Sequence, residues 1–102
     1  MTTALDRKLA GQMLWAMGAG RRLEEIEAEL FARREMPGFA HLGIGEEAAF
    51  VGAVAALKDF DVLLPTHRGI SGVIMKGVPL RGIAGEMLGR STGTAQGRGE
   101  PR

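Results

Sequence analysis

The chain has 102 residues, of which 45% are hydrophobic and 25% charged, and a formal net charge of +1. This composition is typical of one small globular domain, or part of a larger one, and excludes a disordered chain. The balanced charge gives no electrostatic reason for binding nucleic acid or a membrane surface. The absence of cysteine excludes disulfides and cysteine nucleophiles, and it agrees with a cytoplasmic location.

Apolar residues spaced mostly three and four apart predict one long amphipathic helix from about residue 4 to about residue 34. They are Leu5, Leu9, Met13, Ala16, Met17, Leu23, Ile26, Leu30 and Phe31. One of two threonines near the start can cap the helix. Gly18 and Gly20 are unfavourable inside a helix, so they indicate a kink, a break or a close contact with another element. The acidic stretch 24–29 is interpreted as a solvated face.

The turn Met36-Pro37-Gly38 ends this segment, because proline cannot continue a helix. A second helix is expected from about residue 45 to about residue 57; it is apolar nearly all round and should be buried on most faces. Val62-Leu63-Leu64 is expected to be a short buried extended piece. A third helix should end at about Lys76, and a fourth should cover residues 80–88.

These elements predict a mainly α fold with about four helices. Residues 1–90 would form the helical part. Residues 91–102 would form a glycine-rich mobile tail, since no apolar period continues into them.

The most informative stretch for function is Thr66-His67-Arg68-Gly69, which follows a proline and precedes a helix-like apolar pattern. We refer to it as the corner. The guanidinium of Arg68 suits phosphate or carboxylate oxygens, and a helix start favours anions. The alternative is that this arginine pairs with Glu46, Glu47 or Asp61 and only fixes the fold. Residue types alone leave both interpretations open.

Three other motifs have simpler interpretations. Gly43-x-Gly45 lacks the preceding strand and the third glycine of a dinucleotide fingerprint, so it is interpreted as a loop leading into a helix. His41 is interpreted as a hydrogen-bonded packing residue, because the chain has only one other histidine and no cysteine to complete a zinc site. Of the adjacent Glu46 and Glu47, one is expected to face a pocket and the other to be solvated.

Several short motifs follow one another along the chain. They are Glu-Leu-Phe-Ala-Arg-Arg-Glu-Met-Pro-Gly-Phe-Ala-His-Leu-Gly-Ile-Gly-Glu-Glu-Ala at 29–48, the corner at 66–69, Lys-Gly at 76–77 and Glu-Met-Leu-Gly-Arg at 86–90. In order and spacing they resemble the N-terminal region of the alpha subunit of thiamine-diphosphate-dependent 2-oxo acid dehydrogenases. Pyruvate, branched-chain 2-oxo acid and acetoin dehydrogenases form that group. The resemblance extends from about residue 10 to Gly99.

The resemblance implies that the helices correspond to the N-terminal helical part of an α/β thiamine-diphosphate-binding fold. It implies oxidative decarboxylation of a 2-oxo acid, with acyl transfer to a lipoyl group. The partners would be a dehydrogenase beta subunit and the lipoyl-bearing acyltransferase of the complex. By the same resemblance, His67 and Arg68 contact the diphosphate of the cofactor.

The chain also departs from the family pattern. The family binds Mg²⁺ through a Gly-Asp-Gly motif and a later asparagine, and this chain has neither, so the metal would be bound by residues not present here. Ile70 stands where a histidine is common, and no catalytic residue can be assigned. Two hypotheses follow: a truncated or split part of an alpha subunit, inactive alone, or a non-catalytic helical interaction module that keeps the family's subunit-contact surface.

Overall fold

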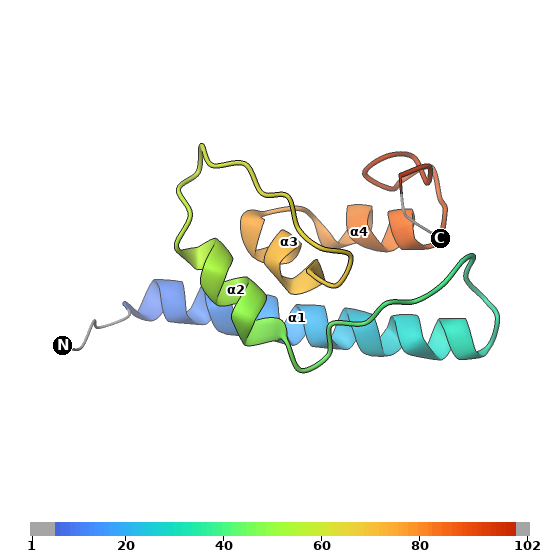
Figure 1. Ribbon diagram of the computed structural model, residues 1–102, viewed down its shortest axis with the longest axis horizontal. Helices are drawn as coiled ribbons and strands as arrows, with labels where there is room; N and C mark the ends of the chain where they lie inside the picture. Colours follow the sequence, from blue (N-terminus) through green and yellow to red (C-terminus); the bar gives the residue numbers. More distant parts are fainter. Residues whose placement is uncertain (1–5, 100–102) are drawn as a thin grey trace.

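The computed structural model describes residues 6–99, which form four helices joined by loops (Figure 1). The helices are α1 (Arg7–Ala32), α2 (Glu47–Ala55), α3 (Ile70–Lys76) and α4 (Leu80–Met87). α2 and α3 pack on α1 and on each other, and α4 follows α3 along the molecule. The described part of the chain contains no strand, which confirms the mainly α prediction.

α1 is one unbroken helix of 26 residues. Its N-cap is Asp6, whose carboxylate accepts a hydrogen bond of 2.7 Å from the backbone N–H of Leu9 and so satisfies one of the free donors at the helix start. The threonines predicted as caps, Thr2 and Thr3, lie outside the described residues. The helix ends at Ala32, slightly before the predicted end.

Gly20 marks a close contact between α1 and α3. A Cβ atom at this position would lie 2.7 Å from the Cβ and 3.0 Å from the Cα of Ser71. A Cβ atom at Gly18, in contrast, would meet no atom within 4 Å. Of the three predicted meanings of these glycines, the close contact is therefore correct, and it belongs to Gly20.

Alanine substitutions at these two glycines are expected to have opposite effects on stability. Gly18→Ala should raise the free energy of unfolding by up to about 1 kcal/mol, because alanine is the better helix former. Gly20→Ala should lower it, since overpacking against Ser71 costs about 1–3 kcal/mol and exceeds the propensity gain. Urea denaturation of both variants measures the difference, and a stabilised Gly20→Ala protein would show that α1 and α3 do not touch there.

The hydrophobic core is small and draws residues from all four helices. Its buried members are Ala16, Val51, Ile74, Ile83 and Met87. Partly buried side chains from α1, α3 and α4 surround this cluster. No helix in the described range 6–99 is long and apolar enough to cross a membrane.

Two predictions of burial are wrong. In α2, Val51 and Val54 are buried, but the alanines at 48, 49 and 53 are exposed. The segment 62–64 lacks regular structure as expected, yet Val62 is 85% and Leu64 91% exposed. In Figure 1 this loop runs along the outside of α2 and α3. The apolar sequence of these two segments therefore did not predict burial correctly, because nothing in residues 6–99 covers these side chains.

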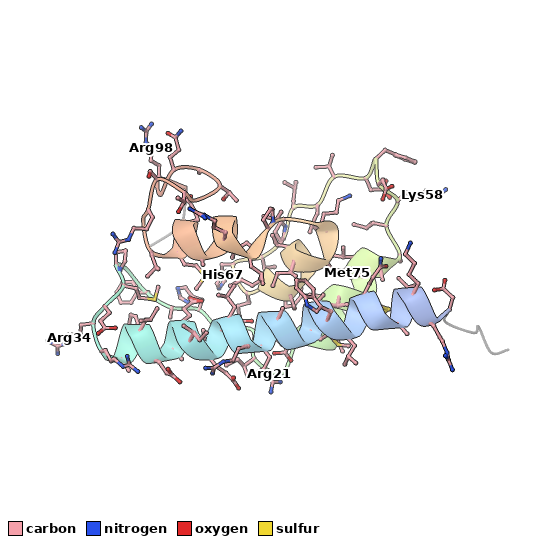
Figure 2. All side chains as sticks on the ribbon, turned by 180° about the vertical axis from the view of Figure 1, so that it is seen from behind. Arg21, Arg34, Lys58, His67, Met75 and Arg98 are labelled. Carbon is pink, nitrogen blue, oxygen red and sulfur yellow. The ribbon has the colours of Figure 1, made fainter. Side chains whose placement is uncertain are left out.

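After α4 the chain forms turns that fold back over Glu86. The buried carboxylate of Glu86 accepts hydrogen bonds from the backbone N–H groups of Ala95 (2.8 Å), Gly97 (2.9 Å) and Gly99 (2.7 Å). Arg98 lies at the outer edge of this loop (Figure 2). The mobility of the tail and the boundary near residue 90 stay predictions.

Candidate functional site

The corner lies in the loop directly before α3. The backbone N–H of Gly69 donates to the carbonyl of Thr66 at 3.0 Å, and the N–H of Arg68 donates to the Thr66 hydroxyl at 3.3 Å. This turn leaves the side chains of His67 and Arg68 exposed. Because α3 has only seven residues, the chemistry of the corner rests on these side chains more than on the helix start.

His41 joins the corner from the loop between α1 and α2. The ring centroids of His41 and His67 are 4.7 Å apart, and the ring planes meet at 80°, so the two imidazoles pack edge to face. His67 lies near the middle of the molecule in the view of Figure 2. The predicted hydrogen-bonded packing role of His41 is not observed: in residues 6–99 its side chain is exposed, makes no hydrogen bond and contacts the ring of the other histidine. Sequence reasoning missed this pair because nothing local links the two positions.

Arg68 makes no ion pair with any residue in the range 6–99, so the structural-pairing alternative is not observed. Glu47 pairs with Arg21 instead. Asp61 accepts a 2.8 Å hydrogen bond from the backbone N–H of Lys58. The guanidinium of Arg68 is therefore available to an anion from outside the chain.

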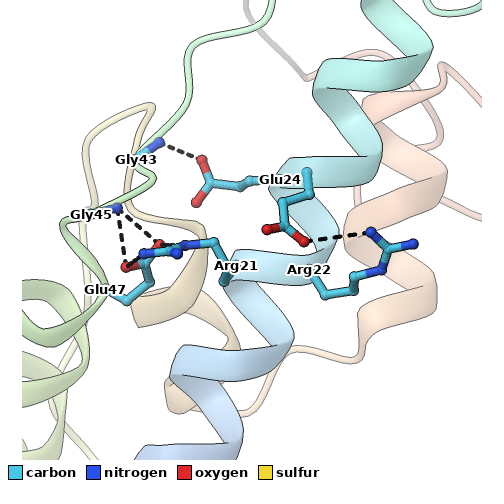
Figure 3. Close-up of polar contacts among 7 residues, drawn as sticks. Arg21, Arg22, Glu24, Gly43, Gly45 and Glu47 are labelled. Carbon is cyan, nitrogen blue, oxygen red and sulfur yellow. Dashed lines mark hydrogen bonds and ion pairs between the residues drawn. The ribbon is translucent and has the colours of Figure 1, made fainter.

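The Arg21–Glu47 pair anchors the loop that carries His41 (Figure 3). Arg21 donates from Nε at 2.8 Å and from Nη2 at 2.9 Å, one bond to each oxygen of Glu47. The same carboxylate accepts the backbone N–H of Gly45 at 3.1 Å. Hydrogen bonding to Arg21 lowers the pKa of Glu47 to about 2. Glu47 is buried and Glu46 exposed, as their divergence on the helix predicted.

Glu24 is a second anchor, and its position corrects a prediction. Its carboxylate accepts a hydrogen bond from the backbone N–H of Gly43 (Figure 3). Glu24 is 0% and Glu27 5% exposed, so the predicted solvated face is wrong at these two positions, although Glu25 and Glu29 are exposed. The buried stripe of α1 thus contains small and acidic residues as well as apolar ones.

The two buried glutamates are incompletely paired. Oε1 of Glu24 and Oε2 of Glu27 are buried without a hydrogen-bond partner among residues 6–99. Burial raises the pKa of Glu27 to about 7, and the neighbouring Glu24 adds to this shift. Burial also raises the pKa of Glu24, against the lowering effect of the Gly43 N–H.

The stability of the fold should fall as pH rises from about 4.5 to about 7. In this window folded Glu27 keeps its proton, whereas unfolded Glu27 has lost it, so ionisation opposes folding by up to about 1.4 kcal/mol per pH unit. Glu47 contributes the opposite sign, but only below its ordinary pKa, as pH falls toward about 2. Guanidinium denaturation across the window should show the slope, and Glu27→Gln should reduce it, leaving the contribution of Glu24, whose pKa is also raised. Equal slopes in both proteins would contradict the assignment to Glu27.

A cavity of about 410 Å³ opens beside the corner. Thr66, His67 and Thr94 contribute polar groups to its lining, and Ile70 and Ile83 contribute apolar ones. A larger hollow of about 590 Å³ lies where α1 meets the ends of α2 and α3, away from the corner. In the described part of the chain, no three His, Asp or Glu side chains gather as a metal site would require.

Residues 16–101 match the family described as the dehydrogenase E1 component. The chain belongs to this family. It is 46% identical over 79 residues to the alpha subunit of acetoin:2,6-dichlorophenolindophenol oxidoreductase from Bacillus subtilis, which covers 78% of this chain and 24% of that protein. It is 34% identical over 98 residues to the mitochondrial pyruvate dehydrogenase E1 component subunit alpha of Chaetomium thermophilum, covering 96% of this chain and 24% of that protein.

A chloroplastic E1 alpha subunit from rice, pyruvate dehydrogenase alpha-3, is 34% identical over 97 residues, or 95% of this chain and 23% of that protein. The E1 chain described here therefore spans about a quarter of the length of the curated relatives it matches. No solved structure matches it.

Proposed function

We propose that this chain is the N-terminal part of the alpha subunit of a thiamine-diphosphate-dependent 2-oxo acid dehydrogenase, and that it forms one wall of the cofactor site but is inactive alone. The reaction is oxidative decarboxylation with acyl transfer to a lipoyl group. Its partners are a dehydrogenase beta subunit and a lipoyl-bearing acyltransferase, in the cytoplasm. Membership of the dehydrogenase E1 family supports this proposal.

One observation carries the cofactor assignment: His67 and Arg68 stand side by side, exposed, with no ion pair to Arg68 in the range 6–99. A guanidinium beside an imidazole fits the oxygens of a diphosphate, because both can donate hydrogen bonds to anionic oxygen. These two residues would therefore hold the diphosphate end of thiamine diphosphate. The bound cofactor supplies the carbanion chemistry that decarboxylates 2-oxo acids, while this chain binds and orients it.

The magnesium ion that accompanies the diphosphate does not fit this chain. Magnesium prefers oxygen ligands in octahedral geometry, usually carboxylates together with phosphates. The sequence contains no asparagine and no Gly-Asp-Gly motif. The metal ligands must therefore come from another polypeptide segment, which is why the chain alone is proposed to be inactive.

The exposed apolar side chains support such a partner. Phe60, Val62 and Leu64 are 79%, 85% and 91% exposed, and Trp15 and Leu14 on α1 are also exposed. Large apolar side chains that are exposed together in one loop, as at 60–64, are typical of a surface that another chain covers. The same surface suits the alternative, a non-catalytic helical module that binds the family's partners. Ile70 favours that alternative, because it puts an apolar group where the family commonly has a histidine.

Arg68→Ala tests the proposal. The chain would be co-expressed with a beta subunit and with the part of the Bacillus subtilis acetoin:2,6-dichlorophenolindophenol oxidoreductase alpha subunit that it does not match, roughly three-quarters of that protein. Calorimetric titration with thiamine diphosphate and Mg²⁺ should show affinity weakened about tenfold or more, since a charge-assisted hydrogen bond contributes about 1.5–3 kcal/mol. Arg22→Ala is the matched control, because the one ion pair of Arg22 within residues 6–99 is with exposed Glu25.

Unchanged affinity in Arg68→Ala would reject the ligand role. If the wild-type assembly forms but binds no cofactor, the interaction-module alternative is the correct one.

A further inference from the structure

The loop between α1 and α2 touches the corner at one very close contact. A Cβ atom added to Gly43 would lie 2.3 Å from the carbonyl oxygen and 3.4 Å from the Cβ of Arg68, so the two backbones are in contact. His41 lies two residues before Gly43. His67 directly precedes Arg68. The backbone contact therefore brings together the two segments that carry the imidazoles.

The carboxylate of Glu24 is hydrogen-bonded to Gly43 at this contact. It accepts the backbone N–H of Gly43 from a position that is 0% exposed, and its Oε1 has no partner among residues 6–99. A buried carboxylate with an unpartnered oxygen destabilises a fold relative to an apolar side chain of similar size. Core packing alone therefore does not account for a glutamate here, whereas the need for a hydrogen-bond acceptor does.

We infer that Glu24 is a positioning residue: through the N–H of Gly43 it holds His41 against the corner. Arg21, three residues earlier on the same helix, fixes the next part of the loop through Glu47. One turn of α1 thus orients the histidine pair from a distance. The positioning of the histidine pair is a property of the chain without cofactor. Only the use of this pair in a cofactor site rests on the proposed function.

The two histidines of the chain allow a direct test by NMR of the 102-residue protein without any ligand. The wild type should show a nuclear Overhauser effect between the two imidazole rings, which are 4.7 Å apart. Glu24→Met, which keeps the volume and removes the acceptor, should lose this cross-peak and shift both imidazole signals while helicity by circular dichroism is kept. Glu24→Gln should restore the cross-peak, because its amide oxygen accepts the same N–H.

Glu27→Met is the matched control, since Glu27 is almost equally buried on α1 but makes no hydrogen bond to the loop among residues 6–99. It should keep the cross-peak. Loss of the cross-peak in Glu27→Met would overturn the inference, because any change in the buried stripe would then have the same effect. Persistence of the cross-peak in Glu24→Met would also overturn it.

Gly43→Ala decides the matter if Glu24→Met fails to fold. Its added methyl group collides with the Arg68 carbonyl, so the cross-peak should disappear. Gly52→Ala, where a Cβ meets no atom within 4 Å, should leave it unchanged. A persisting cross-peak in Gly43→Ala would overturn the inference. No cofactor enters these measurements, so their outcome is separate from that of the Arg68→Ala titration.

Discussion

Replacing Ile74 by alanine should lower the free energy of unfolding by about 2–5 kcal/mol. Ile74 is 5% exposed on α3 and belongs to the core cluster that joins all four helices. Truncation removes buried apolar surface and leaves a cavity that the short neighbouring helices cannot fully close. Because a domain of this size is stable by only about 5–15 kcal/mol, the variant should lose a large share of its stability. Thermal and urea denaturation measure the loss.

The matched control is Leu64→Ala. Leu64 also loses most of a large aliphatic side chain, but it is 91% exposed and should change stability by no more than about 0.5 kcal/mol. Equal losses in the two variants would show that the loop containing Leu64 is buried in solution, for example in an assembly of several copies.

Glu86→Ala should release the loop that follows α4. The carboxylate of Glu86 accepts three backbone N–H groups, from Ala95, Gly97 and Gly99. Hydrogen bonds to a buried charged group are among the stronger ones in proteins, and losing this set should cost about 2–4 kcal/mol. Amide hydrogen exchange at the three donors should rise toward the rate of an unstructured chain, while the amides of α1 stay protected.

Two further variants give this result its meaning. Glu86→Gln keeps one acceptor oxygen, so the three amides should exchange at an intermediate rate. Glu46→Ala removes an exposed glutamate and should leave their exchange rate unchanged. Fast exchange of the three amides already in the wild type would contradict the contact and support the predicted mobile tail.

The local pattern of the sequence predicted the helices well. Periodic apolar residues located α1 and α4, and Gly77, which adopts a left-handed conformation with φ of 114°, marks the end of α3. The corner was found from its residue types and from its place before an apolar helix. These features depend on residues that are close together in the chain, so the sequence alone is enough to predict them.

The remainder depended on contacts between distant segments. Glu24 and Glu27 look like surface residues because charge is normally solvated, and only the packing of the described helices shows them buried. The approach of His41 to His67 depends on the contact at Gly43, and no pattern in the sequence predicts that contact. Val62 is exposed because no residue in the range 6–99 covers it, and its apolar neighbours in the sequence do not show this.

The buried stripe of α1 also restricts how the helices can pair. Ala16, Gly20 and Glu24 follow one another at intervals of one turn on the face toward α2 and α3. Sliding α1 by one turn would place the glutamate where not even a methyl group fits, because the Cβ and the backbone of Ser71 fill the space beside Gly20. It would also leave Gly43 without its acceptor. The stripe therefore fits α2 and α3 in one register only. The same small and polar residues that make this core less apolar exclude packings in which α1 is shifted by one turn.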